Sequence, residues 1–197
     1  MNDAHVSTRV ATEVDVDRLS STLWAAFFED PLWSWAFPNR DQLEVWWRFL
    51  ITSALRYPWV WIRGDFAAAA VWIPPGGSEL TAQEEDRVEP LLEDLLGGRS
   101  AEVMQLLERF DASRPTDEPH YYLSLLGTHP DFRGQGLGMD LLAENLARID
   151  EEAMPAYLES SNPANNERYE DAGFRRVGEF STPDGSCVVA TMWREAR

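Results

Sequence analysis

Hydrophobic positions along the chain follow two different periods, which predict a mixture of helices and strands. Apolar residues spaced at i, i+3 and i+4 predict helices over about 14–29 and 41–56. Runs of strand-forming residues bounded by turn residues predict strands at 7–12, 59–63, 66–73, 120–128, 156–160, 174–181 and 187–193. Further helices are expected within 79–112, from the glycine-rich stretch after residue 133 to about 150, and at 165–173. The order of these elements predicts a mixed α/β sheet without internal repeats.

Glycine and proline divide the middle of the chain. Gly97 and Gly98 split 79–112 into two helical patterns, and Ser100 is predicted to cap the second. The stretch "SRPTDEP" is linker-like but too short to separate two domains, so residues 1–197 are predicted to form a single domain.

Composition narrows the class of protein. The chain has 197 residues, 44% of them hydrophobic, and a formal net charge of −17, which argues against a nucleic-acid partner. The charge serves solubility or attracts protonated amines, and it does not by itself select a substrate. No apolar run is long enough for a membrane span, and the N-terminus lacks a signal-peptide pattern.

The cysteine and histidine content adds little specific chemistry. Cys187 is the single cysteine, which excludes an intrachain disulfide and predicts a cytoplasmic location. It is expected to be a small apolar residue, with a nucleophile as the alternative. No cluster of metal ligands is present, since His5, His120 and His129 are scattered, and no metal is expected.

The stretch "HPDFRGQGLG" (129–138) carries three glycines at every second position, between a predicted strand and a predicted helix. A strand, a glycine turn and a helix start bring free backbone N–H groups together and favour a bound phosphate. The spacing is neither the dinucleotide fingerprint nor a nucleotide P-loop, because Gly138 is followed by Met139 and Asp140. The pattern that fits is Arg/Gln-x-x-Gly-x-Gly/Ala, formed by Arg133, Gly136 and Gly138.

A second motif follows in "YLESSNPANNERYEDAGF" (157–174), with Asn165, Tyr169, Gly173 and Phe174 at defined spacing. In their order and separation, the two motifs resemble those of the GCN5-related N-acetyltransferase (GNAT) superfamily. More narrowly and more loosely, the rest of the chain resembles the puromycin N-acetyltransferase group, for example in "AAFFEDPLWSWAFP" and "VWIRGDFAAAAVWIPPGG". The resemblance implies an acyl-CoA N-acyltransferase fold, with a mixed, mostly antiparallel sheet that splays between strands 120–128 and 156–160.

The resemblance also implies that acetyl-CoA is the cosubstrate. Its pantetheine arm would lie in the splay and its pyrophosphate on the glycine stretch, where side chains at 134, 136 and 138 would occupy the space of the phosphates. The residues implied in coenzyme binding are Leu126, Gly127, Thr128, Arg133, Gly134, Gln135, Gly136, Leu137, Gly138, Met139 and Asn165.

Two residues are candidates for acid–base catalysis. The motif places Tyr169 near the sulfur as the acid, and the alternative is a tyrosine that packs the short helix. Glu159 ends a strand where it can point into the splay, and burial would raise its pKa toward neutrality, as a base requires. The alternatives for Glu159 are a structural role and deprotonation through water. The oxyanion donor is expected to be a backbone N–H near Leu126 or Gly127.

The acceptor pocket is expected in the proline-broken segment between the first two helices. Trp33, Trp35 and Phe37 would form an aromatic floor, and Glu29 and Asp30 would anchor an ammonium group. The equally weighted alternative is that the aromatic residues are core and the acids are solvated.

The sequence therefore predicts an acetyl-CoA-dependent N-acetyltransferase that acts on a primary amine of a small molecule, an antibiotic or a metabolite, by direct attack in a ternary complex. The alternatives are a protein or peptide N-acetyltransferase and a CoA-binding module without catalysis. No membrane or nucleic-acid partner is expected, and residues 174–193 leave a homodimer open.

Overall fold

A computed structural model describes residues 7–197, in which seven strands form one mixed sheet. The spatial order of the strands is β1-β2-β3-β4-β5-β7-β6. All neighbouring pairs are antiparallel except β4 and β5, which run parallel. The predicted fold class, a mixed and mostly antiparallel sheet flanked by helices, is confirmed. His5, one of the scattered histidines, lies outside the described residues.

The strands are β1 (Thr8–Val10), β2 (Val60–Arg63), β3 (Ala68–Ile73), β4 (Tyr121–Thr128), β5 (Ala156–Ser160), β6 (Arg175–Ser181) and β7 (Val188–Arg194). The helices are α1 (Val16–Phe27), α2 (Pro31–Ala36), α3 (Arg40–Ala54), α4 (Ala82–Glu85), α5 (Val88–Leu96), α6 (Ser100–Ser113), α7 (Leu137–Glu151) and α8 (Asn166–Asp171). No helix among residues 7–197 combines the length and the apolar character that a bilayer crossing requires.

The prediction missed one helix and misplaced one cap. Residues 31–36 form α2, because Pro31 is tolerated in a first helical turn and the Asp30 side chain accepts hydrogen bonds from Leu32 N (3.0 Å) and Trp33 N (3.2 Å). Ser100 is not an N-cap. A 3-10 turn at Gly97–Arg99 runs directly into α6, so Ser100 is already helical and its hydroxyl caps nothing.

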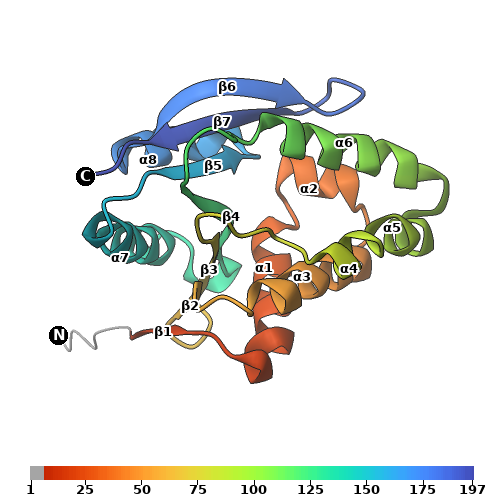
Figure 1. The fold of residues 1–197 in the computed structure, drawn as a ribbon. Helices are drawn as coiled ribbons and strands as arrows, with labels where there is room; N and C mark the ends of the chain where they lie inside the picture. The colour runs from red at the N-terminus through yellow and green to blue at the C-terminus, as the bar shows by residue number, and fades with distance from the viewer. Residues whose placement is uncertain (1–6) are drawn as a thin grey trace.

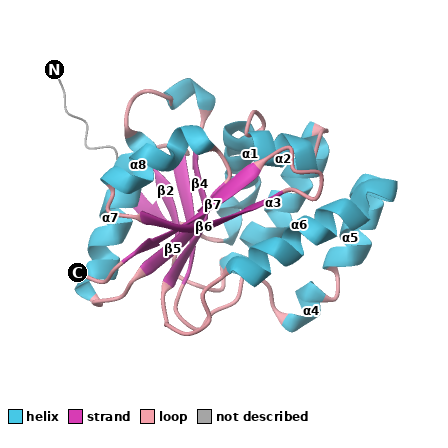
Figure 2. Ribbon diagram, turned by 90° about the horizontal axis from the view of Figure 1, so that it is seen from above, coloured by secondary structure: helices cyan, strands magenta, loops and turns pink. Residues whose placement is uncertain are grey.

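Helices cover both faces of the sheet and enclose two hydrophobic cores. Figure 1 shows α7 on one side of the strands and α1, α3, α5 and α6 on the other, and Figure 2 shows the strands fanning out between the two layers. On the α7 side, Leu141, Leu142 and Ile149 pack on Trp72, whose indole N–H donates to Asn145 (2.9 Å). The opposite core contains most of the aromatic side chains, including Trp33 and Trp47.

The sheet opens between β4 and β5. These strands pair only where Tyr121–Leu123 face Ala156–Leu158, although β4 continues to Thr128. The remaining residues of β4 keep their pairing with β3, so their other edge has no strand partner. The pairing with β3 also shifts by one residue at Ser124, a β-bulge that twists β4 at this point.

Removal of one carboxylate is expected to destabilise the fold measurably. Arg194 is 3% exposed, and its guanidinium donates to both Asp150 oxygens, at 2.6 and 2.7 Å. Asp150→Asn leaves this charge buried without its partner and should lower the free energy of unfolding by about 3 kcal/mol at pH 7. Urea denaturation measures the difference, with the neighbouring exposed Glu151→Gln as the control.

The same ion pair should also show in the pH dependence of stability. Hydrogen bonding to Arg194 holds the pKa of Asp150 below its ordinary value. Its contribution is therefore complete above the ordinary aspartate range and is lost as the pH falls through the lowered pKa. Equal urea midpoints for Asp150→Asn and the unmodified protein at pH 7 would contradict this account.

Candidate active site

The glycine stretch is shaped as an anion cradle. Gly134 and Gly136 have φ values of +78° and +77°, which L-residues with side chains rarely adopt. Within the described residues, no backbone N–H of residues 134–139 donates a hydrogen bond to the protein. Six consecutive donors at the start of α7 are therefore available to a ligand, and the positive end of the helix favours an anion.

Gly138 allows a close approach between two elements. A Cβ there would lie 2.4 Å from Thr128 Oγ1 on β4. A Cβ at Gly134 would instead meet nothing within 4 Å. The glycine at 138 thus allows α7 to start directly against β4, whereas the glycine at 134 supplies a backbone conformation and leaves the space beside it open.

A cavity of about 540 Å³ lies on this cradle and is called the loop cavity below. Arg133 borders it, and its guanidinium is fixed to the end of α1 by Glu29 (3.0 Å) and the Ala26 carbonyl (3.1 Å). Of the eleven residues predicted for coenzyme binding, Gln135 does not line this cavity. The ten that do are Leu126, Gly127, Thr128, Arg133, Gly134, Gly136, Leu137, Gly138, Met139 and Asn165.

A second cavity, of about 410 Å³, lies farther along β4, beside Tyr122–Leu126, and is called the aromatic cavity. Trp33, Trp46, Trp47 and Phe110 line it together with several carboxylates. Of the five residues predicted for the acceptor pocket, the structure brings only Trp33 here.

The other four residues predicted for the acceptor pocket lie elsewhere. Glu29 and Asp30 border the loop cavity, because they follow α1. Phe37 is fully buried in the core. Trp35 lies nearer the surface, where its Nε1–H donates an exposed hydrogen bond to Asp184 at 2.9 Å. Asp30 is also committed to its cap on α2 and to Ser161 Oγ (2.8 Å), and burial raises the pKa of its carboxyl.

The two cavities meet at the open edge of β4. Phe27, Leu126, Asn165 and Tyr169 line both of them. A molecule that extends from the glycine cradle along β4 therefore reaches the aromatic cavity at Leu126 and Tyr169.

Glu159 lines the aromatic cavity from β5. Its Oε1 is buried and has no hydrogen-bond partner among residues 7–197. Burial raises the pKa of Glu159 to about 7, against the opposing effect of the Arg114 charge. A carboxyl group with this pKa can accept a proton and release it again near neutral pH.

Tyr169 lies at the junction of the cavities and remains protonated at neutral pH. Burial raises the pKa of its hydroxyl to about 12, and the nearby Asp30 charge adds to the rise. The ring packs edge-on against Phe174, with 6.2 Å between the ring centroids. The protonated side chain of Tyr169 thus borders both cavities.

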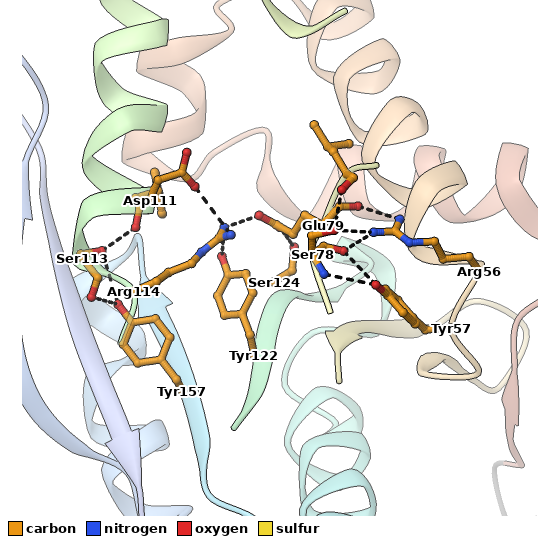
Figure 3. Close-up of polar contacts among 12 residues, drawn as sticks. Arg56, Tyr57, Ser78, Glu79, Asp111, Ser113, Arg114, Tyr122, Ser124 and Tyr157 are labelled. Carbon is orange, nitrogen blue, oxygen red and sulfur yellow. Dashed lines mark hydrogen bonds and ion pairs between the residues drawn. The ribbon is translucent and has the colours of Figure 1, made fainter. Parts of the chain in front are cut away.

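Sequence reasoning missed a charged network on the wall of the aromatic cavity. Figure 3 shows Arg114 between Asp111, Glu79 and Tyr122, with Ser124 next to the Glu79 carboxylate. Arg114 lies in the stretch that was predicted to be a linker, and Glu79 lies in a loop after two prolines and two glycines. An arginine in a polar stretch gives no local sign of burial, so the sequence carried no signal for this network.

Among residues 7–197, no three His, Cys, Asp or Glu side chains are arranged to hold a metal ion.

A family model and a curated relative match this chain. The family model described as "Acetyltransferase (GNAT) domain" matches residues 112–193. An uncharacterized N-acetyltransferase of Schizosaccharomyces pombe is 27% identical over 176 residues, which covers 81% of this chain and 70% of that protein. The matched segment contains β4, the glycine cradle, Glu159 and Tyr169.

Solved structures share the fold over nearly the whole chain. One is described as histone acetyltransferase HPA2 and related acetyltransferase, from Corynebacterium glutamicum. It is 22% identical, has a TM-score of 0.69, and the match covers 98% of this chain and 97% of that one. An agmatine N-acetyltransferase is 16% identical, with a TM-score of 0.71 and coverage of 96% and 99%. At these identities the likeness concerns the fold.

Proposed function

We propose that this protein, an acyl-CoA-dependent N-acetyltransferase whose residues 112–193 match the GNAT family model, transfers the acetyl group of acetyl-CoA to a primary amine of a small molecule. The observation that carries the proposal is the junction of two cavities, one on an anion cradle and one lined by aromatic and acidic side chains. The transfer takes place in a ternary complex at Leu126 and Tyr169.

The loop cavity fits acetyl-CoA. The diphosphate of acetyl-CoA accepts hydrogen bonds from the free N–H groups of residues 134–139, and Arg133 adds a fixed positive charge. The pantetheine amides pair with the unpartnered edge of β4, up to Leu126–Thr128. The thioester then lies at the junction with the aromatic cavity.

The chain supplies a group for each proton and charge in the reaction. Glu159 takes a proton from the ammonium group of the acceptor, directly or through one water, so that the neutral amine attacks the thioester carbonyl. A backbone N–H near Leu126 or Gly127 stabilises the oxyanion. When the C–S bond breaks, Tyr169 gives its proton to the departing thiolate of CoA. The second proton of the attacking nitrogen, released as the amide forms, returns to the tyrosine oxygen directly or through water.

The lining of the aromatic cavity indicates the class of acceptor. Its walls are indole and phenyl rings, and Glu79, Glu85, Glu108, Asp111 and Glu159 face it, with Arg114 as the single basic residue among those that line it. Carboxylates attract a protonated amine, and aromatic faces favour cations and apolar groups. The agmatine N-acetyltransferase, which shares the fold, is named for a small cationic amine. We infer that the acceptor is a small amine with an apolar portion.

Release of the CoA thiol tests the proposal. The protein is mixed with acetyl-CoA and a panel of primary amines that includes agmatine, arylalkylamines, puromycin and lysine peptides, and free thiol is measured. Turnover on a small amine supports the proposal, whereas turnover on peptides alone would favour a protein acetyltransferase. Binding of acetyl-CoA without turnover on any amine would favour a CoA-binding module.

Tyr169→Phe is expected to lower kcat by about 10–100-fold and to leave the affinity for acetyl-CoA within about twofold, because only the proton donor is lost. The melting temperature should stay close to that of the unmodified protein, since the ring keeps its contact with Phe174. Stopped-flow thiol release and calorimetric titration measure the two constants. An unchanged kcat would remove Tyr169 from the reaction and leave it a packing residue of α8.

A further inference from the structure

We propose that Glu79 is a positioning residue for proton removal, which pairs with Arg114 and so withholds the charge of that guanidinium from Glu159. The inference rests on the proposed role of Glu159 as the base. It assigns a function to a loop residue that is remote from both motifs in the sequence.

Both oxygens of the Glu79 carboxylate are held in place. Oε1 accepts a hydrogen bond from Ser124 Oγ, and Oε2 forms an ion pair with Arg114 (Figure 3). The side chain of Glu79 is 20% exposed and that of Arg114 is 25% exposed, so water screens the pair only partly. Arg56 fixes the loop itself, by donating to the Glu79 carbonyl at 3.0 Å.

The bulge in β4 contributes to this geometry. Ser124 is the extra residue at the register shift, and its hydroxyl reaches Glu79 across the cavity wall. A regular strand would alternate its side chains between the two faces without this extra residue. The bulge therefore places a hydrogen-bond donor to Glu79 on β4, the strand whose unpaired edge borders the loop cavity.

Two carboxylates, those of Glu79 and Glu159, attract the positive charge of Arg114. It lies over the Tyr122 ring, 4.3 Å from the ring centroid, and donates to the Tyr122 hydroxyl at 3.2 Å. A guanidinium stabilises any carboxylate that it approaches, and a stabilised carboxylate is a poor base. Glu79 forms an ion pair with this guanidinium, whereas no ion pair joins Arg114 and Glu159 among residues 7–197, and the pKa of Glu159 stays at about 7.

Other titratable groups lie near Glu159 or line the cavity. Tyr157 lies beside Glu159 on β5, where its hydroxyl donates to the Ser113 carbonyl at 3.1 Å and His120 packs against its ring. The remaining ones that line the cavity are Glu85 on α4, Glu108 and Asp111 on α6, Tyr122 on β4 and Tyr169 on α8. Asp111 lies 3.6 Å from Arg114 and is 74% exposed, so it screens the guanidinium less than Glu79 does.

The proposal predicts opposite effects for the two members of the pair. Glu79→Gln keeps the shape and the hydrogen-bond acceptor but removes the charge, so Arg114 then acts on Glu159 in full and lowers its pKa. Arg114→Gln removes the positive charge and leaves Glu79 and Glu159 to repel each other, so the pKa of Glu159 rises. General damage to the site would not shift the two variants in opposite directions.

The experiment is the pH profile of kcat/KM at saturating acetyl-CoA, from pH 5 to 9, with the amine found in the thiol-release screen. Glu79→Gln should move the midpoint of the acidic limb down by about one pH unit, and Arg114→Gln should move it up by a similar amount. Glu79→Asp retains the charge and should restore a midpoint close to that of the unmodified protein. Glu151→Gln removes one exposed carboxylate far from the cavity and serves as the charge control.

A second readout does not depend on activity. Carboxyl resonances of ¹³C-labelled glutamate are titrated, and the resonance that is missing in Glu159→Gln reports Glu159 directly. An unchanged titration midpoint in Glu79→Gln, or shifts of the same sign in both variants, would overturn the proposal. An acidic limb that persists unchanged in Glu159→Gln would instead overturn the proposed base, and the resonance titration still tests the charge relation between Glu79 and Glu159.

Discussion

Glu159→Gln is expected to lower kcat/KM at pH 8 by about 10²–10³-fold, because the amide cannot accept the proton of the acceptor ammonium. The unmodified protein should gain activity as the pH rises through about 7, the pKa to which burial raises Glu159. In the Glu159→Gln variant, this rise of activity with pH should disappear. Acetyl-CoA affinity should stay unchanged, since Glu159 is not among the residues that line the loop cavity.

The same substitution should stabilise the protein. The folded-state pKa of Glu159 lies above its value in an unfolded chain, so the folded state loses stability as the pH rises from about 4.5 to 7. At pH 8, Glu159→Gln removes this cost and should raise the free energy of unfolding by about 2–3 kcal/mol.

Urea denaturation at pH 5 and pH 8 measures the difference, which should be large only at the higher pH. A decrease in activity together with an increase in stability distinguishes a lost base from a damaged site. Full activity across the pH range would show that the proton leaves through water instead.

Gly138→Val is expected to weaken acetyl-CoA binding by more than about 100-fold. The new Cβ would lie 2.4 Å from Thr128 Oγ1, so we expect the start of α7 to move away from β4. That movement displaces the free N–H groups of the cradle from the position in which they converge on the diphosphate. The overpacking should also cost about 1–3 kcal/mol of stability. Calorimetric titration and thermal melting measure the two effects.

A double-mutant cycle isolates the cause of this effect. Thr128→Ala removes Oγ1 and leaves its own Cβ 3.8 Å from the new atom, an ordinary contact. Gly138→Ala should therefore weaken binding much less in the Thr128→Ala background than alone. Gly98→Ala is the matched control, because a Cβ there meets nothing within 4 Å and the residue lies far from the cradle. If Gly138→Val binds acetyl-CoA with normal affinity, the diphosphate does not bind at the start of α7.

Local sequence patterns predicted most of the fold. The apolar spacing of 41–56 is that of α3, and the strand-forming runs at 59–63 and 120–128 correspond to β2 and β4, because hydrophobic periodicity reports directly which face of an element is buried. The pattern failed at α2, where two prolines suggested a break. One of them, Pro31, occupies the first turn, a position that the helix tolerates.

The candidate site likewise has a part that the sequence predicts and a part that it does not. The glycine cradle and Tyr169 could be predicted from the sequence, because each lies within one contiguous motif whose residues act together in space. The aromatic cavity could not be predicted as a whole, because its walls come from α1, α2, α3, the loop between β3 and α4, α4, α5, α6, β4, β5 and α8, which are far apart in the chain. Trp35 and Phe37 illustrate the error: composition marks them as aromatic, but only packing shows that one contacts Asp184 and the other is core.

The sequence by itself determined the order of the elements, the mixed α/β class and the glycine cradle, because all of these depend on local periodicity and turn chemistry. Only the tertiary structure decided which charged side chains come together in the wall of the aromatic cavity. Glu79, Arg114 and Glu159 are separated by 35 and 45 residues along the chain, and no local pattern records their encounter. Their energies depend on shared burial and on the distances between charges, which exist only once the chain has folded.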